Sequence, residues 1–432
     1  MRKSRLLSIL VASIVFLSGC GAQSAAISAA PLPSDDGATE ITIEVDDVVN
    51  FYANAAMKFE TMTGVKVNVI NHYSPTTPID DQDYAYLDRI PGELMAGNGA
   101  DIYANINIDT AAIGRKGYLC NLADWIAEDS DFSDDKYYMN IWRAGFNGGD
   151  KYSLPVFMMF LAFGSDVEIP ELDGKDLNWE EFFELTKGIN RNGVLVGLTD
   201  SEIFIRRFND RYSSFIDEEN KTETLNSPEL IHLLEQSKTW SEQGLCVPNN
   251  ADNFEDIFNN AFIKEYGSDI QVLTNVRFAD GPSSLSPYWY DIPSDSGKND
   301  KANKLLTRDH ICINAASPNK GTAWKFIKFL LSKDIQLIGY STPMNREAAA
   351  GYIKNMMESS IGETTQNKEA DKVITEAETI LDNLSDVPNR YRLTGIEKIL
   401  LKEAKSYFNN EISAEEAAKN MSESVKLYMK EQ

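Results

Sequence analysis

Residues 41–70, ITIEVDDVVNFYANAAMKFETMTGVKVNVI, are the most informative segment for the fold class. Its first five and last six residues are typical of short β-strands, because β-branched residues dominate and apolar residues alternate in VKVNVI. Between them, apolar residues recur at helical spacing until Gly64 provides a stop. A strand, a helix and a second strand in this order predict an α/β architecture with a largely parallel sheet.

Polar residues follow the next predicted strand. A helix is expected to end at GNGAD, and IYANI, residues 102–106, is expected to form the third strand, with Asn105, Asn107 and Asp109 at its end. Ligands of open α/β sheets bind outside the carboxyl ends of the strands, so these residues are site candidates. A turn stabilised by local hydrogen bonds of Asn and Asp explains them equally well.

The first forty residues have the composition of an export signal followed by a tether. Three basic residues precede an apolar segment, residues 6–16, that is too short to span a bilayer. Leu17-Ser18-Gly19-Cys20 resembles the lipobox of bacterial lipoproteins, which implies a lipid on Cys20; an ordinary secretory signal is the alternative. Residues 1–19 are therefore predicted to be a lipoprotein signal peptide and residues 20–39 a flexible tether.

Composition narrows the class of partner. Asp and Glu number 66 against 41 Lys and Arg, and this net charge of −25 argues against nucleic acid and anionic lipid as partners. The remaining length suggests two domains. Besides Cys20, only Cys120, Cys246 and Cys312 are present, without metal-binding spacing, so we expect buried thiols or one disulfide, and no metal or cofactor.

Several segments in order resemble one family. They are FETMTGVKV, GNGADIYANINIDTAAIGRKGYLCNLADW, KYSLPVFMMFLAFGSD, LNWEEFFELTKGI, INAASPNKGTAWKFIKFLLS (residues 313–332) and ISAEEAAKNMSESVKLYM. Their order and spacing resemble the maltose-binding-like group of extracellular solute-binding proteins of bacterial ABC importers. The resemblance extends from about residue 40 to the end.

This resemblance implies a fold and its division into lobes. The fold is periplasmic-binding-protein-like (type II), with two α/β lobes around a ligand cleft and hinge crossings near residues 152–156, 268–276 and 338–344. Lobe 1 would comprise residues 40–154 and 271–338, and lobe 2 would comprise residues 155–270 and 339–432. The implied partners are a small polar solute, most simply a sugar, and the permease subunits of an ABC transporter, with the protein a monomer held at the extracellular face of the cell membrane by its lipid.

The same resemblance assigns ligand contacts. In lobe 1 they fall on Asp46 and Asp47, beside Asn105 and Asn107. In lobe 2 they fall on Glu202 and Phe204 within LTDSEIFIRRF, and on Tyr391 with Arg392 within VPNRYRLTGIEKIL. Arg277 stands where the family has an aromatic platform, a departure that casts doubt on maltose itself. In YWY, strand alternation places Trp289 opposite its neighbours, so that one side can reach the cleft. Each of these residues could instead be an ordinary surface residue or helix cap.

Two other functions fit the same sequence features. An exported sensor that presents a ligand to a membrane receptor would have the same sequence features. A lipoprotein glycoside hydrolase is less favoured, because the chain has no GxSxG, HExxH or phosphate-loop motif and its three histidines are scattered. We therefore expect a solute-binding protein and not an enzyme.

Overall fold

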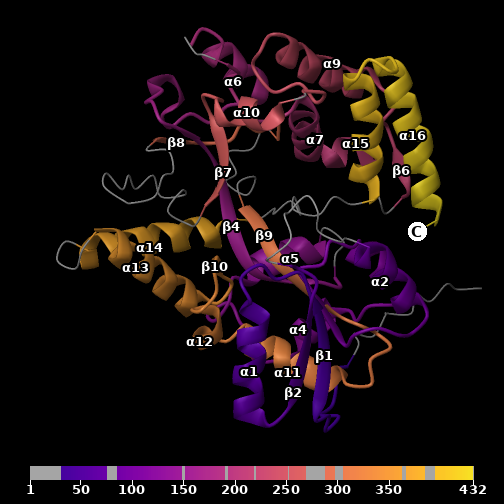
Figure 1. Ribbon diagram of the computed structural model, residues 1–432, viewed down its shortest axis with the longest axis vertical. Coiled ribbons are helices and arrows are strands. Elements are labelled where there is room, and N and C mark those ends of the chain that lie inside the picture. The colour runs from indigo at the N-terminus through magenta and orange to yellow at the C-terminus, as the bar shows by residue number, and fades with distance from the viewer. Residues whose placement is uncertain are drawn as a thin grey trace, which may run out of the picture.

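The computed structural model describes residues 31–74, 85–147, 151–189, 193–217, 220–251, 253–268, 288–296, 305–361, 366–384 and 395–431. Two α/β lobes lie one above the other, and two strands near the centre run between them (Figure 1). This arrangement confirms the predicted fold class.

One mixed sheet spans both lobes. Its main path has the order β10-β4-β9-β3-β1-β2, and β7 and β8 pair with the far end of β4. β1 pairs in parallel with β2 and β3, but every ladder that involves β4 or β9 is antiparallel, so the prediction of a largely parallel sheet was wrong. The strands are β1 (Glu40–Val45), β2 (Lys66–Asn71), β3 (Ile102–Ala104), β4 (Leu154–Ser165), β7 (Lys264–Ser268), β8 (Tyr288–Tyr290), β9 (Leu305–Ile313) and β10 (Thr342–Pro343).

Lobe 1 is built around the parallel strands and covered by helices on both faces. Its main core joins β1 to helices from both ends of the chain, and a smaller core lies under α2 and α3. The helices are α1 (Phe51–Thr63), α2 (Tyr86–Met95), α3 (Thr110–Arg115), α4 (Leu122–Glu128), α5 (Met139–Asn147), α11 (Lys320–Leu330), α12 (Lys333–Gln336), α13 (Arg346–Ile361) and α14 (Gln366–Asp382).

The β-α-β unit that begins the fold forms as predicted. Phe51, Ala55 and Phe59 recur on one face of α1 and are buried against the sheet. Gly64 ends the helix in the left-handed conformation, with φ of 77°, and its N–H donates to the carbonyl of Glu60.

Lobe 2 is mostly helical and holds two larger cores. One forms around Trp179, Phe182 and Phe183 against the second half of β4. The other packs the two C-terminal helices against α7 and α9. The elements are α6 (Trp179–Thr186), α7 (Asp200–Asp210), α8 (Tyr212–Phe215), α9 (Pro228–Glu242), α10 (Phe254–Asn259), α15 (Gly395–Phe408) and α16 (Ala414–Glu431), with the 3-10 helix η2 (Pro170–Leu172) and the short hairpin of β5 (Ile216–Asp217) and β6 (Thr222–Glu223).

The two cores show where the described part of the chain changes lobe. β4 leaves the lobe 1 core at Phe160 and enters the lobe 2 core at Leu161, close to the first predicted crossing. Tyr290 still belongs to lobe 2, and β9 carries the chain back to lobe 1. Residues 269–276 of the second predicted crossing, 268–276, lie outside the described residues, so that crossing stays a prediction.

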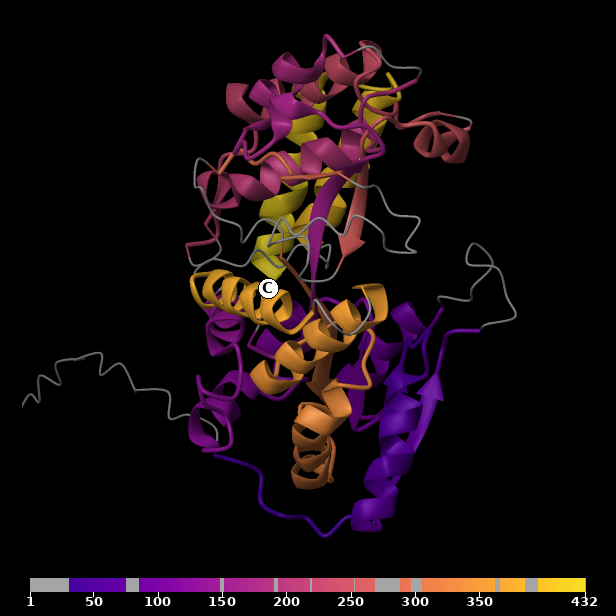
Figure 2. The same ribbon diagram turned by 90° about the vertical axis from the view of Figure 1, so that its left-hand side faces the viewer.

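The third crossing lies later than residues 338–344. Helices α13 and α14 bury Ile353, Ala377 and Leu381 in the lobe 1 core, whereas α15 buries Leu400 in lobe 2. The sequence pattern of an amphipathic helix indicates that one face is buried, but not which sheet that face covers. The pattern of α13 and α14 therefore did not indicate that they pack on lobe 1. Figure 2 shows α13 and α14 in front, stacked on lobe 1.

The last part of the predicted tether is held against lobe 1. The carboxylate of Asp36 accepts hydrogen bonds from the backbone N–H and the hydroxyl of Thr322, at the start of α11. Asp35 pairs with Lys325 at 2.6 Å. In Figure 2 this indigo segment passes along the lower end of lobe 1. Asp35 and Asp36, at the end of the predicted tether, are therefore bound to lobe 1.

Two further expectations concern cysteines and membrane spans. Cys120, Cys246 and Cys312 are buried and none of them is in a disulfide, which confirms the interpretation as packing thiols. Within the described ranges, no helix is long and apolar enough to cross a bilayer.

Candidate functional site

Asp46 and Asn105 meet at the carboxyl ends of β1 and β3. The side-chain amide of Asn105 donates to the backbone carbonyl of Asp46 at 2.6 Å. Asn105 has a φ of 54°, a left-handed conformation that Asn tolerates better than most residues. The hydroxyl of Tyr86, on α2, donates to the Asp46 carboxylate at 2.9 Å. The predicted pair of strand-end residues thus forms one polar cluster.

A second layer of polar side chains supports this cluster. The Tyr86 ring stacks on His72, with ring centroids 4.0 Å apart. His72 lies 2.8 Å from the buried carboxylate of Glu44, which also pairs with Arg89 at 2.7 Å. Because these side chains hold one another, the hydroxyl that reaches Asp46 has a fixed position.

Asp47 shapes the loop after β1. It is buried, and its carboxylate accepts from the backbone N–H groups of Val49 at 3.1 Å and Tyr52 at 2.9 Å. These are groups at the start of α1 that lack intrahelical partners. Whereas Asp47 is buried, the next two residues of the loop, Val48 and Val49, are exposed. Apolar surface therefore lies beside the polar cluster.

Asn107 and Asp109 follow β3 toward lobe 2. Asn107 is exposed. The Asp109 carboxylate caps α3 through the N–H of Ala112 at 2.9 Å and also accepts the hydroxyl of Tyr428, in lobe 2, at 2.7 Å. The pattern of polar residues after the strand indicated Asp109, but nothing in the sequence indicated its partner.

An unusual acid lies within the crossing strand β9. Asp309 is buried, has a φ of 54°, and its two carboxylate oxygens lie 2.8 and 2.7 Å from the hydroxyl of Tyr340. Burial raises its pKa to about 6, although the Tyr340 hydrogen bond and nearby Arg308 oppose that rise. Beside it, His310 lies between the hydroxyls of Ser153, at 3.0 Å, and Thr307, at 2.9 Å. No sequence pattern indicated this polar cluster.

Glu202 and Phe204 have local roles in this structure. The Glu202 carboxylate accepts the backbone N–H of Thr199, while the Thr199 hydroxyl accepts the N–H of Glu202, which is a complete capping box. Phe204 is fully buried in the core that joins α7 to α15 and α16. The described geometry therefore places neither side chain with the lobe 1 cluster.

The other predicted contacts fall outside the described part of the chain. These are Arg277, Tyr391 and Arg392, the lipid-bearing Cys20, and the side chain of Trp289. Trp289 itself lies on β8, and its neighbour Tyr290 faces the lobe 2 core.

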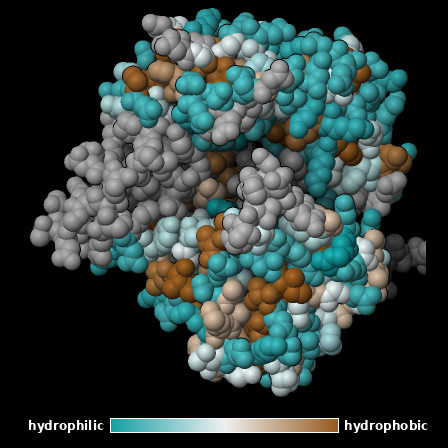
Figure 3. Space-filling model, viewed as in Figure 1, coloured by the Kyte–Doolittle hydropathy of each residue, from teal (hydrophilic) through white to brown (hydrophobic). Residues whose placement is uncertain are grey.

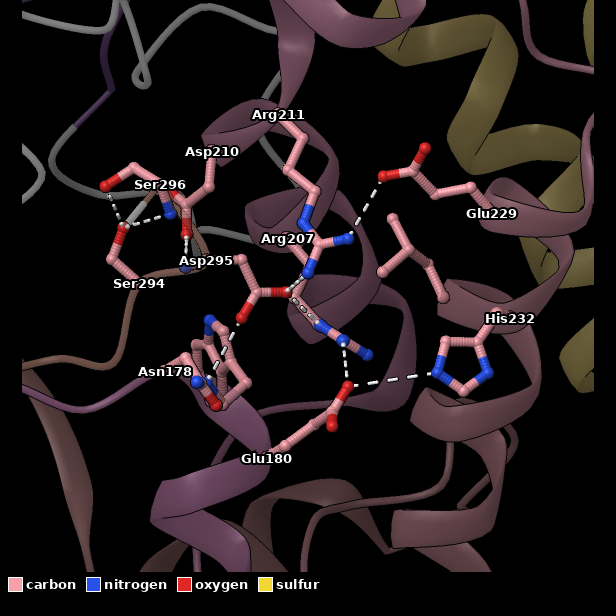
Figure 4. Close-up of polar contacts among 12 residues, drawn as sticks. Asn178, Glu180, Arg207, Asp210, Arg211, Glu229, His232, Ser294, Asp295 and Ser296 are labelled. Atoms are coloured by element: carbon pink, nitrogen blue, oxygen red, sulfur yellow. Dashed lines mark hydrogen bonds and ion pairs between the residues drawn. The ribbon is translucent and has the colours of Figure 1, made fainter. Parts of the chain in front are cut away.

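A second polar cluster lies wholly inside lobe 2, where Asp295 joins α6, α7 and the segment after β8 (Figure 4). Arg207, whose side chain is fully buried, donates to Asp295 at 2.7 Å and lies over the Trp240 ring at 4.8 Å. Burial lowers the pKa of the Arg207 guanidinium and Asp295 opposes this shift. Arg211 also reaches Asp295, at 3.3 Å. These charges are directed at one another, so the cluster is structural.

The lobe 1 cluster lies at the carboxyl ends of β1 and β3. Figure 3 shows the surface hollowed between the two lobes. Across the described ranges, no group of three or more His, Cys, Asp and Glu side chains could hold a metal ion.

Two α/β lobes, strands that cross between them and polar residues at the carboxyl ends of parallel strands are typical of bilobal solute-binding proteins. The sequence matches the family described as Bacterial extracellular solute-binding protein over residues 54–359, and the chain belongs to this family. It is thus an exported binding protein for a small solute that serves an ABC importer. No curated protein matches the sequence.

Proposed function

We propose that the protein captures a carbohydrate or oligosaccharide between its lobes and delivers it to the importer without converting it. The observation that carries the proposal is the cluster of Asp46, Asn105 and Tyr86 at the sheet edge, next to exposed Asn107. Carboxylate and amide groups exchange hydrogen bonds with hydroxyl groups, the main polar groups of a sugar.

The surroundings of this cluster favour a neutral polyol over an anion. Asp46 and Asp109 lie at the same edge, and the whole chain carries a net charge of −25. Val48 and Val49 offer apolar surface against which the C–H face of a sugar ring can pack. By resemblance to the family, Tyr391 supplies an aromatic platform, with Arg392 beside it.

We further propose that a lipid on Cys20 holds the protein at the outer face of the membrane. A tether raises the local concentration of a carrier near its permease. Replacing Cys20 by Ser should release the protein from the membrane fraction and leave solute affinity unchanged. Retention of Cys20→Ser in that fraction would contradict lipid anchoring.

A thermal-shift screen tests the solute class. Sugars, oligosaccharides, polyols and peptides are added separately at millimolar concentration, and a bound solute raises the melting temperature by mass action. We expect at least one carbohydrate to raise it, and mass spectrometry to recover that carbohydrate unchanged. A shift only with peptides would contradict the carbohydrate assignment, and a converted product would contradict binding without catalysis.

A further inference from the structure

Asp109 joins the two lobes through hydrogen bonds. Its Oδ2 accepts the hydroxyl of Tyr428 at 2.7 Å and the backbone N–H of Gly395 at 3.3 Å. Its Oδ1 accepts the N–H of Ala112 at 2.9 Å, which fixes the carboxylate to α3 of lobe 1. The carboxylate is thus held rigidly in one lobe while it binds two groups of the other.

The lobe 2 side of this contact is formed by two helices that pack together. Gly395 begins α15, and Tyr428 lies near the end of α16. A Cβ atom on Gly395 would come within 2.4 Å of the Tyr428 ring, so the glycine lets the ring lie directly over the start of α15. An acceptor carboxylate at the N-terminus of a helix also interacts favourably with the helix dipole.

The contact lies away from the strands that connect the lobes. Figure 1 shows the lower ends of α15 and α16 over lobe 1, to one side of β4 and β9. If the lobes open about these strands on the side where α15 and α16 lie, the distance between Tyr428 and Asp109 increases. The hydrogen bond between them then forms in this arrangement and breaks in a more open one.

We propose that Asp109 and Tyr428 form an interlobe latch that favours the closed arrangement before any solute binds. The latch rests on the proposed function for its purpose, because a larger closed population raises the apparent affinity for whatever the cleft holds. Asp109 and Tyr428 act here as positioning residues, and neither has to touch the solute.

The distance between the lobes can be measured without knowing the solute. In the full chain carrying Cys20→Ser, nitroxide labels on Met62→Cys in lobe 1 and Leu185→Cys in lobe 2 report the separation by pulsed electron resonance. Both positions are exposed, and the three remaining cysteines are buried. A chain without the two introduced cysteines verifies that the native thiols stay unlabelled.

The test compares Tyr428→Phe, which removes only the hydroxyl, with Tyr407→Phe on the neighbouring α15. Tyr407 lies over Lys238, within lobe 2, so its hydroxyl serves as the matched control. We expect Tyr428→Phe to raise the ratio of long to short distances about tenfold, the effect of losing one hydrogen bond to a charged group. Tyr407→Phe should leave the ratio unchanged.

Two results would overturn the latch: identical distance distributions for the parent and Tyr428→Phe, or equal shifts for the two variants. Asp109→Ala should reproduce the shift of Tyr428→Phe, and a parental distribution for it would also contradict the proposal. Because no solute is added, these outcomes are independent of the thermal-shift screen. Failure of the latch and failure of the carbohydrate assignment can therefore be told apart.

Discussion

The hydroxyl of Tyr340 lies 2.8 and 2.7 Å from the two carboxylate oxygens of Asp309. Asp309 belongs to β9, a strand that connects the lobes. The guanidinium carbon of Arg308 lies over the Tyr340 ring, 5.3 Å from its centroid. Burial is the main cause that raises the pKa of Tyr52, and the nearby charge of Asp309 adds to the rise. The pKa of Asp309 is likewise raised mainly by burial, and the charge of Asp47 adds to it. A buried acid is thus built into the hinge region.

Asp309 should make the protein more stable in mild acid. Its pKa is about 6 in the folded state against 3.8 for an ordinary Asp, so between pH 4 and 6 the folded chain holds a proton that the unfolded chain has lost. The contribution to stability therefore falls as the pH rises through this window, by at most about 3 kcal/mol.

Asp309→Asn should remove this contribution, and Asn tolerates the positive φ at this position. Urea unfolding of the parent and the variant between pH 4 and 7.5 measures the effect. We expect the free-energy difference between them to change with pH in favour of the variant at pH 7.5. Parallel pH curves would show that the pKa of Asp309 is not raised.

The buried pair of Arg207 and Asp295 should be costly to break. Asp295→Ala leaves a buried guanidinium without its main partner and should lower the free energy of unfolding by about 3 to 5 kcal/mol. Glu229→Gln is the matched control, since half-exposed Glu229 pairs with Arg211, and it should cost less than about 1 kcal/mol. Equal losses in denaturant unfolding would refute a special role of the buried pair.

The docked end of the tether should contribute to α11. Asn319, at the start of that helix, makes no side-chain capping bond, and Asp36 from the tether bonds there instead. Asp36→Ala should cost about 1 kcal/mol, the usual effect of losing a cap, and should expose residues 31–39 to proteolysis. Asp36→Asn retains an acceptor and should behave like the parent; similar cleavage of the two variants would argue against capping.

An aromatic platform at Tyr391 remains a prediction from resemblance alone. If it is correct, Tyr391→Ala should weaken the binding of the carbohydrate found in the screen by about 1 to 3 kcal/mol, as expected for losing a buried aromatic contact. The melting temperature without solute should stay at the parental value. Titration calorimetry measures the affinity, and an unchanged value would remove Tyr391 from the site.

Local patterns predicted the fold better than they predicted the site. Helical periodicity and Gly64 predicted α1 because both act within a few residues. The capping role of Glu202 was also visible in Thr199-x-x-Glu202, but the family resemblance outweighed it. By contrast, Asp309 meets Tyr340 across 31 positions and Asp109 meets Tyr428 across 319. Such contacts depend on how the elements pack, which periodicity does not reveal.

The most direct test of the central claim is a crystal structure with the carbohydrate from the thermal-shift screen. The solute should lie between the lobes and contact both of them, with Asp46, Asn105 or Asn107 bonding to its hydroxyl groups from lobe 1. A solute bound to the outer surface of a single lobe, with the space between the lobes unoccupied, would contradict it.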